Sequence, residues 1–367
     1  MLFHIPIPSN EGGESGGGGG YAGTARHAIT AARRGDLKDA LHLAQHAWQR
    51  AREQKDERRI LEATYAASVV HLIRGDSISA IAAAIDAHQL ATRLGERSLA
   101  AHARVNLCFA GFDLGTREEA EIDLRKCVEQ AVAEKDAGLE IRARVGLGIV
   151  LGELGKFETA PTHFRRALKL AAEYPEYAPP ACITVNMADL HLKSGQARLD
   201  AGNAEDARIE LLESARIAED AYRLALTEEG VPASIDALGV RACALDLLGA
   251  RDKALALLTY AVTLAGETGS RSIVLWVLCE LARIRSLADL HEGARAAYIQ
   301  ALDVATSLRP NAKIQVACAG IAEAEEKLGR ADAAAQWRSR AISEQAEFER
   351  WRRDTRWQLE HLIGAPG

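Results

Sequence analysis

Aromatic residues and proline are scarce in this 367-residue sequence. Phe, Trp and Tyr together make up 5% of the chain, and there are nine prolines. Alanine and leucine dominate long stretches, and these residues lose little conformational freedom when they become helical. The sequence therefore predicts an all-α protein, folded as one large domain or as two to three ordinary ones.

Several functional classes are disfavoured by what is missing. No apolar run approaches the roughly 18–20 residues needed to cross a bilayer, so we expect no membrane partner. The net charge of -6 does not favour binding to nucleic acid. The N-terminus lacks a basic stretch followed by an apolar one, so we expect no secretion signal. The six cysteines include no CxxC pair, which predicts buried, reduced thiols in a cytoplasmic protein.

Motifs for catalysis and metal binding are weak. Residues 13–17 (GESGG) match the G-x-S-x-G nucleophile motif, but that motif requires a strand before it and a helix after it. His42 and His46 could share one helix face, but no glutamate follows the first histidine and no third ligand is evident. We therefore expect no enzymatic activity, no metal and no cofactor.

The first 23 residues differ from the rest of the chain. A run of glycines, NEGGESGGGGG, cannot form a packed core, and residues 1–23 are predicted to be a disordered tail. The apolar strip LFHIPIP at its start could dock as an extended peptide or stay unpacked.

A repeat of about 40 residues occupies most of the remaining chain. Its clearest mark is a turn that begins with Gly, or with Asp in one copy, and ends with Ala. These alanines follow one another at spacings of 40, 40, 40, 47, 47, 40 and 40 residues: Ala40, Ala80, Ala120, Ala160, Ala207, Ala254, Ala294 and Ala334. Small residues at fixed points let neighbouring helices approach, and glycine accommodates the turn between them. Each repeat is therefore predicted to be a hairpin of helix A, a tight turn and helix B.

The two 47-residue intervals predict longer helices. Seven added residues are nearly two helical turns, so a helix can lengthen while its buried face stays aligned. Pro175, Pro179 and Pro180 predict a loop before the first long helix. The second long helix is predicted to extend to about Leu226.

The best copy of the repeat, residues 147–171 (LGIVLGELGKFETAPTHFRRALKLA), resembles the tetratricopeptide repeat. Leu147 and Gly148 match its leucine–small pair, and Ala160, Phe164 and Ala167 match its second helix. The resemblance covers roughly residues 24–343 and is closest to the longer variants of bacterial signalling proteins. It implies a right-handed superhelical solenoid of about eight antiparallel hairpins. It also implies a concave groove lined by helices A that binds a protein or peptide without catalysis.

Placed on the family's register, a set of helix A side chains is predicted to face this groove. The candidate partner-binding residues are Tyr65, His102, Asn106, Phe109, Arg142, Lys193, Trp276, Glu280 and Arg283. Tyr65, Phe109 and Trp276 are the candidate aromatic anchors, because interface energy concentrates in aromatic residues and arginine. The alternative is that these side chains pack between adjacent helices.

Residues 344–367 follow the last repeat and are predicted to form a capping or coupling helix. Phe348, Trp351, Thr355, Leu359 and Leu362 form one apolar stripe. A stack of repeats needs such a cap, although the stripe could instead mediate a homodimer or contact a partner. Arginines on the other side alternate with acidic residues, which is a poor match for nucleic acid.

Two functions follow from these observations. The first is a non-catalytic cytoplasmic scaffold that binds a protein or peptide in its groove. The alternative is a sensory or regulatory module of a bacterial signalling system that acts on an output partner through its C-terminal helix.

Overall fold

The computed structural model describes residues 22–363, except positions 115, 176, 229, 269 and 309. Side chains are further not described at positions 22–23, 113 and 357–363. The predicted tail therefore lies outside the described residues, apart from Ala22 and Gly23, which begin the first helix. The LFHIPIP strip and the GESGG motif also lie outside them.

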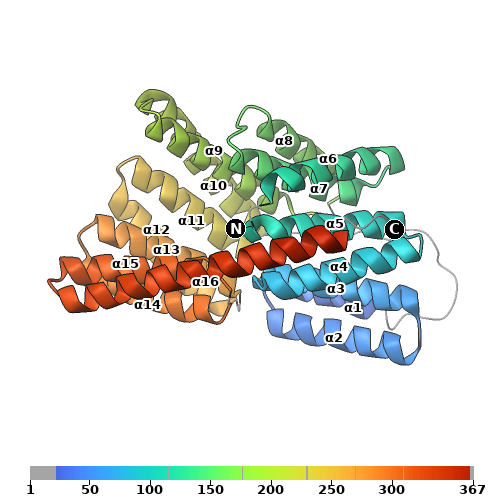
Figure 1. The fold of residues 1–367 in the computed structure, drawn as a ribbon. Coiled ribbons are helices and arrows are strands. Elements are labelled where there is room, and N and C mark those ends of the chain that lie inside the picture. Colours follow the sequence, from blue (N-terminus) through green and yellow to red (C-terminus); the bar gives the residue numbers. More distant parts are fainter. Residues whose placement is uncertain are drawn as a thin grey trace.

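Within the described residues the chain is all-helical, with no strand, and its sixteen α-helices pair into eight hairpins (Figure 1). The first four hairpins are α1 (Ala22–Arg34) with α2 (Leu37–Glu53), α3 (Glu57–Arg74) with α4 (Ser77–Arg93), α5 (Arg97–Ala110) with α6 (Arg117–Glu134), and α7 (Ala137–Glu153) with α8 (Ala160–Glu173). The last four are α9 (Pro180–Asp200) with α10 (Ala204–Thr227), α11 (Val231–Leu247) with α12 (Arg251–Glu267), α13 (Arg271–Leu287) with α14 (His291–Thr306), and α15 (Lys313–Lys327) with α16 (Ala331–Ile363). The predicted solenoid of helical hairpins is confirmed.

The turns lie where the repeat predicted them. Every alanine that ends a turn is at most 4% exposed, from Ala40 to Ala334. Six of the glycines that begin a turn adopt positive φ, for example Gly155 at 72°. In the seventh turn Asp289 takes the left-handed conformation in place of glycine, with φ of 56°. The third hairpin differs, because α5 ends at Ala110 and the chain continues as a short 3₁₀ helix, η1 (Gly111–Leu114).

The two 47-residue intervals form long helices, as predicted. A loop follows α8 and precedes α9, which has 21 residues and begins at Pro180. Proline suits this first helical position, since its missing N–H would have no partner within the helix. The next helix, α10, has 24 residues and ends at Thr227, one residue beyond the predicted end at Leu226.

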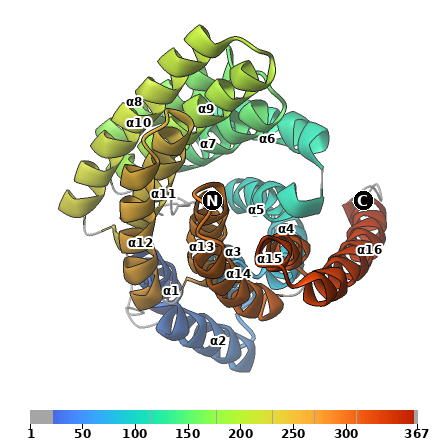
Figure 2. The ribbon, with the colours of Figure 1, turned by 90° about the vertical axis from the view of Figure 1, so that its left-hand side faces the viewer.

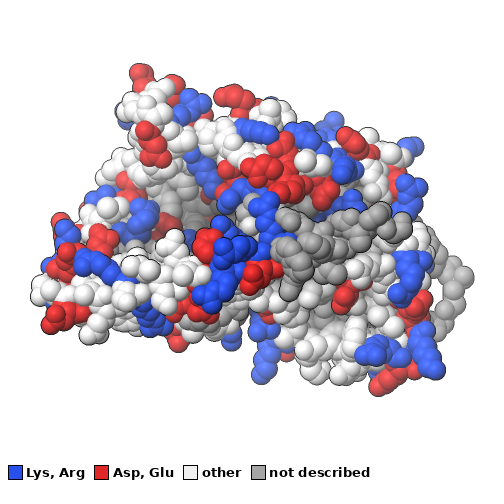
Figure 3. All heavy atoms as spheres, in the orientation of Figure 1, with Lys and Arg blue, Asp and Glu red and all other residues white. Residues whose placement is uncertain are grey.

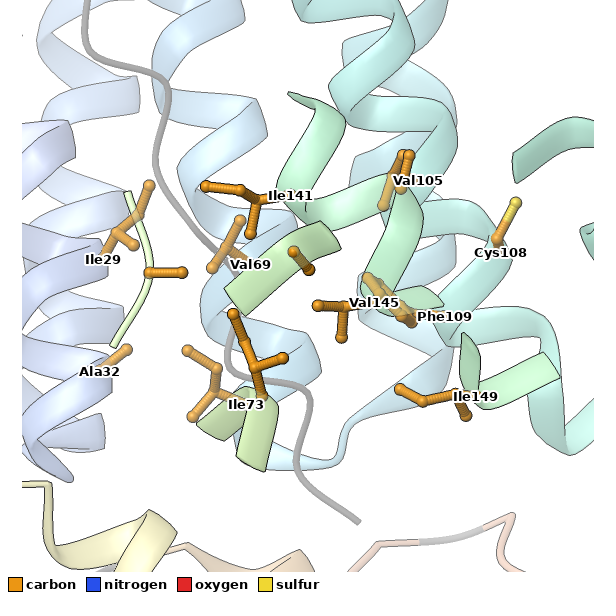
Figure 4. Close-up of a cluster of buried hydrophobic side chains, with 14 of the residues drawn as sticks. Ile29, Ala32, Val69, Ile73, Val105, Cys108, Phe109, Ile141, Val145 and Ile149 are labelled. Carbon is orange, nitrogen blue, oxygen red and sulfur yellow. The ribbon is translucent and has the colours of Figure 1, made fainter. Parts of the chain in front are cut away.

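The small residues of the repeat let bulky side chains pack directly against a helix backbone. A Cβ built on Gly148 in α7 would lie 2.7 Å from the ring of Phe164 in α8. The core continues through the inner helices α1, α3, α5 and α7, which contribute Ile29, Val69, Val105 and Ile141 (Figure 4). These side chains are at most 3% exposed. Their burial against one another holds neighbouring hairpins in register.

The solenoid winds far enough for distant hairpins to touch. α13 contacts α3, and α11 contacts α1 (Figure 2). A Cβ built on Gly75 would lie only 2.7 Å from the Cβ of Ser272, and the Ser270 hydroxyl donates to the carbonyl oxygen of Ile73 at 3.5 Å. Glycine at position 75 thus has two roles. It allows the turn to adopt a φ of 82°, and its lack of a side chain allows the seventh hairpin to approach closely.

The C-terminal helix α16 connects the last hairpin with the second and third hairpins. It runs without a break across the predicted boundary at position 343, so helix B of the last repeat and the terminal segment are one helix of 33 residues. Half-buried Trp351 packs against a cluster formed by Ala80, Ile81, Ala110 and Leu114 in the second and third hairpins. Beyond it, Arg356 pairs with Glu119 of α6 at 2.6 Å.

The apolar stripe of α16 therefore faces this chain's own N-terminal half at Trp351. Phe348 stacks beside Trp351, with ring centroids 5.4 Å apart. The side chains of Leu359 and Leu362 lie outside the described residues.

Lysines and arginines alternate with acidic residues over the face shown in Figure 3, and no single sign of charge dominates it.

Two further findings concern the chain as a whole. All six cysteines are buried free thiols. Within the described part of the chain, no helix combines the length and apolar character that a membrane span requires.

Candidate binding cavity

A cavity of about 440 Å³ lies inside the solenoid, where α13 approaches the inner helices of the second to fifth hairpins. Its apolar lining consists of Leu72, Phe109, Phe112, Ile149, Leu275 and Trp276. Its charged lining consists of Arg117, Glu153, Asp189, Lys193 and Lys313. Such a combination of aromatic surface with a few fixed polar groups is typical of ligand-binding sites.

The aromatic residues come from two walls of the cavity. Phe109 lies in the last turn of α5 and meets Phe112 of η1 edge to face, with ring centroids 5.8 Å apart. The 3₁₀ turn that interrupts the third hairpin is what places Phe112 here. The other aromatic wall is formed by Trp276 of α13, which lies so close to Gly239 of α11 that a Cβ there would clash with the indole ring.

The charged wall is a continuous chain of ion pairs. Arg117 reaches Glu153 at 3.4 Å, Glu153 also pairs with Lys193, and Lys193 reaches Asp189 at 2.9 Å. Burial opposes the charge of Lys193, but Asp189 and Glu153 outweigh it and raise the pKa of the amine. These charges compensate one another, so this wall is polar without a strong net charge.

Lys313 lies on the other side of the cavity. It is exposed and, within the described residues, has no carboxylate at ion-pair distance. It gives the cavity an uncompensated positive charge at one end.

Four of the predicted groove residues meet in a buried cluster beside the cavity. Arg142 of α7 is 0% exposed and donates to the Tyr65 hydroxyl, to Nδ1 of His102 at 2.8 Å and to the side-chain oxygen of Asn106. The Asn106 amide donates onward to Ser68 at 2.6 Å. Three consecutive inner helices, α3, α5 and α7, are joined by this network.

The cluster connects to a single carboxylate through His102. Since Arg142 can only donate, His102 accepts at Nδ1 and holds its proton on Nε2, which lies 3.6 Å from Asp136. Burial lowers the pKa of His102 despite Asp136, so the ring is neutral at pH 7. Burial likewise lowers the pKa of Arg142.

Asp136 is held in place by three groups. It accepts from the Ser98 hydroxyl at 2.6 Å and from the Leu139 amide at 2.9 Å, which caps α7. Burial opposes its ionisation, but His102 and these hydrogen bonds outweigh burial and keep the pKa of Asp136 well below its usual value. The carboxylate is therefore the fixed counter-charge of the buried cluster.

The nine predicted partner-binding residues thus divide into three groups. Phe109, Lys193 and Trp276 line the cavity. Tyr65, His102, Asn106 and Arg142 are buried in the hydrogen-bonded cluster and bind one another. Asn106 is 0% exposed, and its side chain accepts from Arg142 and donates to Ser68.

The last two predicted residues, Glu280 and Arg283, form a separate half-buried cluster on α13. Arg283 donates to Glu280 at 2.9 Å and to Asp246 at 3.3 Å, and Asp246 also accepts from Arg251 at 2.8 Å. The carboxylates of Asp246 and Glu280 are therefore compensated by arginines. A basic partner is not required to balance them.

Several cavity residues were not predicted from the sequence. The repeat pattern predicts groove-facing residues only within helices A. Four lining residues lie instead at or beside turns: Phe112, Arg117, Asn311 and Lys313. They reach the cavity because the solenoid closes on itself, and no local pattern signals that closure.

Among the described residues no group of three or more His, Cys, Asp or Glu side chains could hold a metal ion. His42 and His46 stack with ring centroids 6.4 Å apart.

Comparison with known structures identifies the fold. A Rap protein complexed with competence and sporulation factor is 14% identical, with a TM-score of 0.51, and covers 89% of this chain and 98% of its own. The apo form of the quorum sensor NprR from B. thuringiensis is 13% identical, with a TM-score of 0.52, and covers 88% of this chain and 86% of its own.

A signal-transduction ATPase with numerous domains from Pyrococcus horikoshii, which carries a tetratricopeptide repeat sensor, gives a TM-score of 0.54 at 13% identity. It covers 88% of this chain and 51% of its own. The chain has the tetratricopeptide-repeat fold. No protein-family model matches the sequence, and no curated protein sequence is significantly similar to it. At these low identities the tetratricopeptide-repeat likeness concerns the fold alone.

Proposed function

We propose that the protein is a non-catalytic scaffold that binds a peptide or an extended segment of a protein in the 440 Å³ cavity. The observation that carries this proposal is the pairing of Phe109 and Phe112 on one wall with Trp276 on the other. An extended segment between these walls would bury apolar side chains against three aromatic rings. The six buried thiols suit a reducing compartment, and we place the protein in the cytoplasm.

Two properties of the segment follow from the lining. Its apolar side chains would contact the aromatic walls, and an acidic group would meet Lys313. The charges of Arg117, Glu153 and Lys193 compensate one another. This wall would therefore form hydrogen bonds with the bound segment without favouring either acidic or basic residues in it. The structure of the Rap protein with competence and sporulation factor shows a ligand complex on the same fold.

The test begins with peptides selected from a random display library on the full-length protein. Their affinities for the native chain and for two cavity variants, Trp276→Ala and Lys313→Glu, are then measured by fluorescence anisotropy. Trp48→Ala is the matched control, because Trp48 is exposed on α2 and stacks with Arg52. Affinity should fall at least about tenfold in Trp276→Ala, which corresponds to about 1.4 kcal/mol.

Lys313→Glu distinguishes a direct loss of binding from a loss caused by unfolding, because this exposed residue is not part of the core. It should weaken acidic peptides selectively and leave the melting temperature unchanged. Peptides that bind both cavity variants as tightly as the native chain would show that the cavity is not the binding site.

A second function, a regulatory module that signals through its C-terminal helix, is favoured by the path of α16. This helix begins in the eighth hairpin and ends against the second and third hairpins, which also line the cavity. A ligand that moves these hairpins would shift α16 and its exposed face. Hydrogen–deuterium exchange with and without a selected peptide tests this, because the α16 amides should change in protection. Unchanged protection along α16 would argue against it, as well as against a peptide-controlled homodimer through this helix.

A further inference from the structure

A second pocket, of about 280 Å³, opens between α4, α5 and α6. None of its lining residues belongs to the cavity described above. Its floor is apolar and consists of Ala91, Ala100, Ala101 and Cys127. Burial raises the pKa of the Cys127 thiol to about 11, so the floor carries no charge at pH 7.

One wall of the pocket holds an arginine without a carboxylate partner. Arg104 of α5 is half-buried, and within the described residues no Asp or Glu lies at ion-pair distance from it. Among the described residues, Arg104 has one hydrogen-bond contact, with Nε2 of His88 at 3.4 Å. Arg104 therefore lines the pocket with a positive charge that no carboxylate of the described residues pairs with.

His88 holds this arginine in position. Its Nδ1 lies 2.9 Å from the carbonyl oxygen of Ala100, which can only accept, so Nδ1 carries the proton. Nε2 is then an acceptor and receives the Arg104 N–H. The contact anchors the guanidinium from α4 while leaving its charge uncompensated.

The remaining polar lining is also positive. Arg97 and Lys126 line the pocket, and no lining residue is acidic. The nearest carboxylates are Glu134, 3.7 Å from Arg97, and Asp123, 3.8 Å from Lys126. Both contacts are long and involve mostly exposed basic side chains, so they provide little compensation.

We propose that this pocket binds a small organic anion, with one carboxylate or phosphate group on a compact apolar body such as an aromatic ring. The anionic group pairs with Arg104, because a guanidinium offers parallel donors that match carboxylate and phosphate oxygens. The apolar body covers Ala91, Ala101 and Cys127. The volume is close to the lower end of the range for ligand sites, which limits the ligand to a small molecule. This site is separate from the peptide-binding cavity and does not depend on it.

Phenyl phosphate is the probe, titrated into the full-length protein by isothermal calorimetry. Phenol and inorganic phosphate are titrated in parallel, because each retains only one half of the proposed ligand. We expect saturable binding of phenyl phosphate, and binding at least about tenfold weaker for each half. Amide shifts of Gly95 and Gln130, recorded by NMR, should report the location.

Arg104→Met keeps the apolar length of the side chain and removes the charge. It should weaken phenyl phosphate binding at least about tenfold, as expected for the loss of a charged hydrogen-bonding partner. Arg166→Met is the matched control, since Arg166 is also half-buried but pairs with Glu140, outside this pocket. Lys126→Met, at an exposed rim position, should weaken binding by a smaller factor without changing the melting temperature.

Three results would overturn the proposal. Absence of phenyl phosphate binding excludes the site, and equal binding by native protein and Arg104→Met excludes the role of the guanidinium. Equal affinity for inorganic phosphate or for phenol would show that the ligand class is wrong.

Discussion

Arg142 and Trp276 occupy the same register position in two different hairpins, thirteen residues before the first residue of the turn, Gly155 or Asp289. In the fourth hairpin the position is fully buried and holds the hydrogen-bonded cluster. In the seventh it is half-buried and lines the cavity. The repeat fixes the inward direction of the side chain. The inner helices around that side chain decide whether it is buried, as Arg142 is against α3 and α5, or remains accessible in the cavity, as Trp276 does.

The clusters around two arginines show the same contrast in charge. Arg142 is surrounded by neutral acceptors and reaches a carboxylate only through His102. Arg283 contacts two carboxylates directly, Glu280 and Asp246, while its side chain stays 38% exposed. In these two clusters the N-terminal half uses a buried polar network, whereas the C-terminal half uses ion pairs whose arginines lie near solvent.

The largest expected effect is the loss of the buried arginine. Arg142→Met should lower the free energy of unfolding by roughly 3–5 kcal/mol, because Tyr65, His102 and Asn106 would each lose a partner in a buried site. Arg283→Met should lower it by less, about 1 kcal/mol, because Arg283 is 38% exposed and the buried Asp246 keeps its pair with Arg251. Urea denaturation of the two variants measures both values. Comparable losses would show that the two halves do not differ in the way we describe.

Most of the fold could be predicted from the sequence, because the hairpins are set by local rules. Glycine or Asp289 at the turns, alanine after them and the seven-residue extensions all act within one repeat or between neighbours. The path of α16 and the closure between Gly75 and Ser272 depend on the accumulated rotation of many repeats. No single repeat encodes that rotation, so both features required the structure.

The candidate site could be predicted only in part, for the same reason. Phe109, Lys193 and Trp276 were found because inward-facing positions follow the repeat. Phe112 reaches the cavity through a 3₁₀ turn, and Lys313 through the packing of a distant hairpin. The burial of Arg142 also depends on partners from two other hairpins, which the amphipathic pattern of α7 does not reveal.

The next effect concerns the helix that joins the two halves. Trp351→Ala should lower the free energy of unfolding by about 2 kcal/mol, since a half-buried indole would leave the cluster of Ala80, Ile81 and Leu114. Small-angle scattering should show a larger radius of gyration as the eighth hairpin separates from the third. Trp48→Ala, on the exposed face of α2, should change both quantities little. An unchanged radius would mean that contacts such as those of Gly75 close the solenoid without α16.

A smaller effect is expected on acidification, and two carboxylates of the N-terminal half, Asp76 and Asp136, should contribute to it. His71 and the Ser79 contacts lower the pKa of Asp76 to about 2, although burial opposes this, and the pKa of Asp136 is also lowered. A carboxylate whose folded pKa is below its unfolded value of about 4 stabilises the fold above pH 4. This stability is lost as the pH falls toward the folded value.

Asp136→Asn and Asp76→Asn should therefore reduce the difference in unfolding free energy between pH 7 and pH 3. Asp252→Asn, at an exposed position on α12, serves as the control from the C-terminal half. A pH dependence that stays the same in both N-terminal variants would place the acid-sensitive groups elsewhere.

The smallest effect tests the contact between Arg356 and Glu119, which joins α16 to α6 across the two halves. Their side chains are 42% and 53% exposed, so solvent screens the pair and its contribution should be at most about 1 kcal/mol. Glu119→Arg alone should destabilise the protein slightly by placing two cations together, and adding Arg356→Glu should restore the pair. A double-mutant cycle from urea denaturation isolates this coupling. Coupling that vanishes in Trp351→Ala would show that the ion pair forms only after the tryptophan has docked, so that burial, and not charge, holds the two halves together.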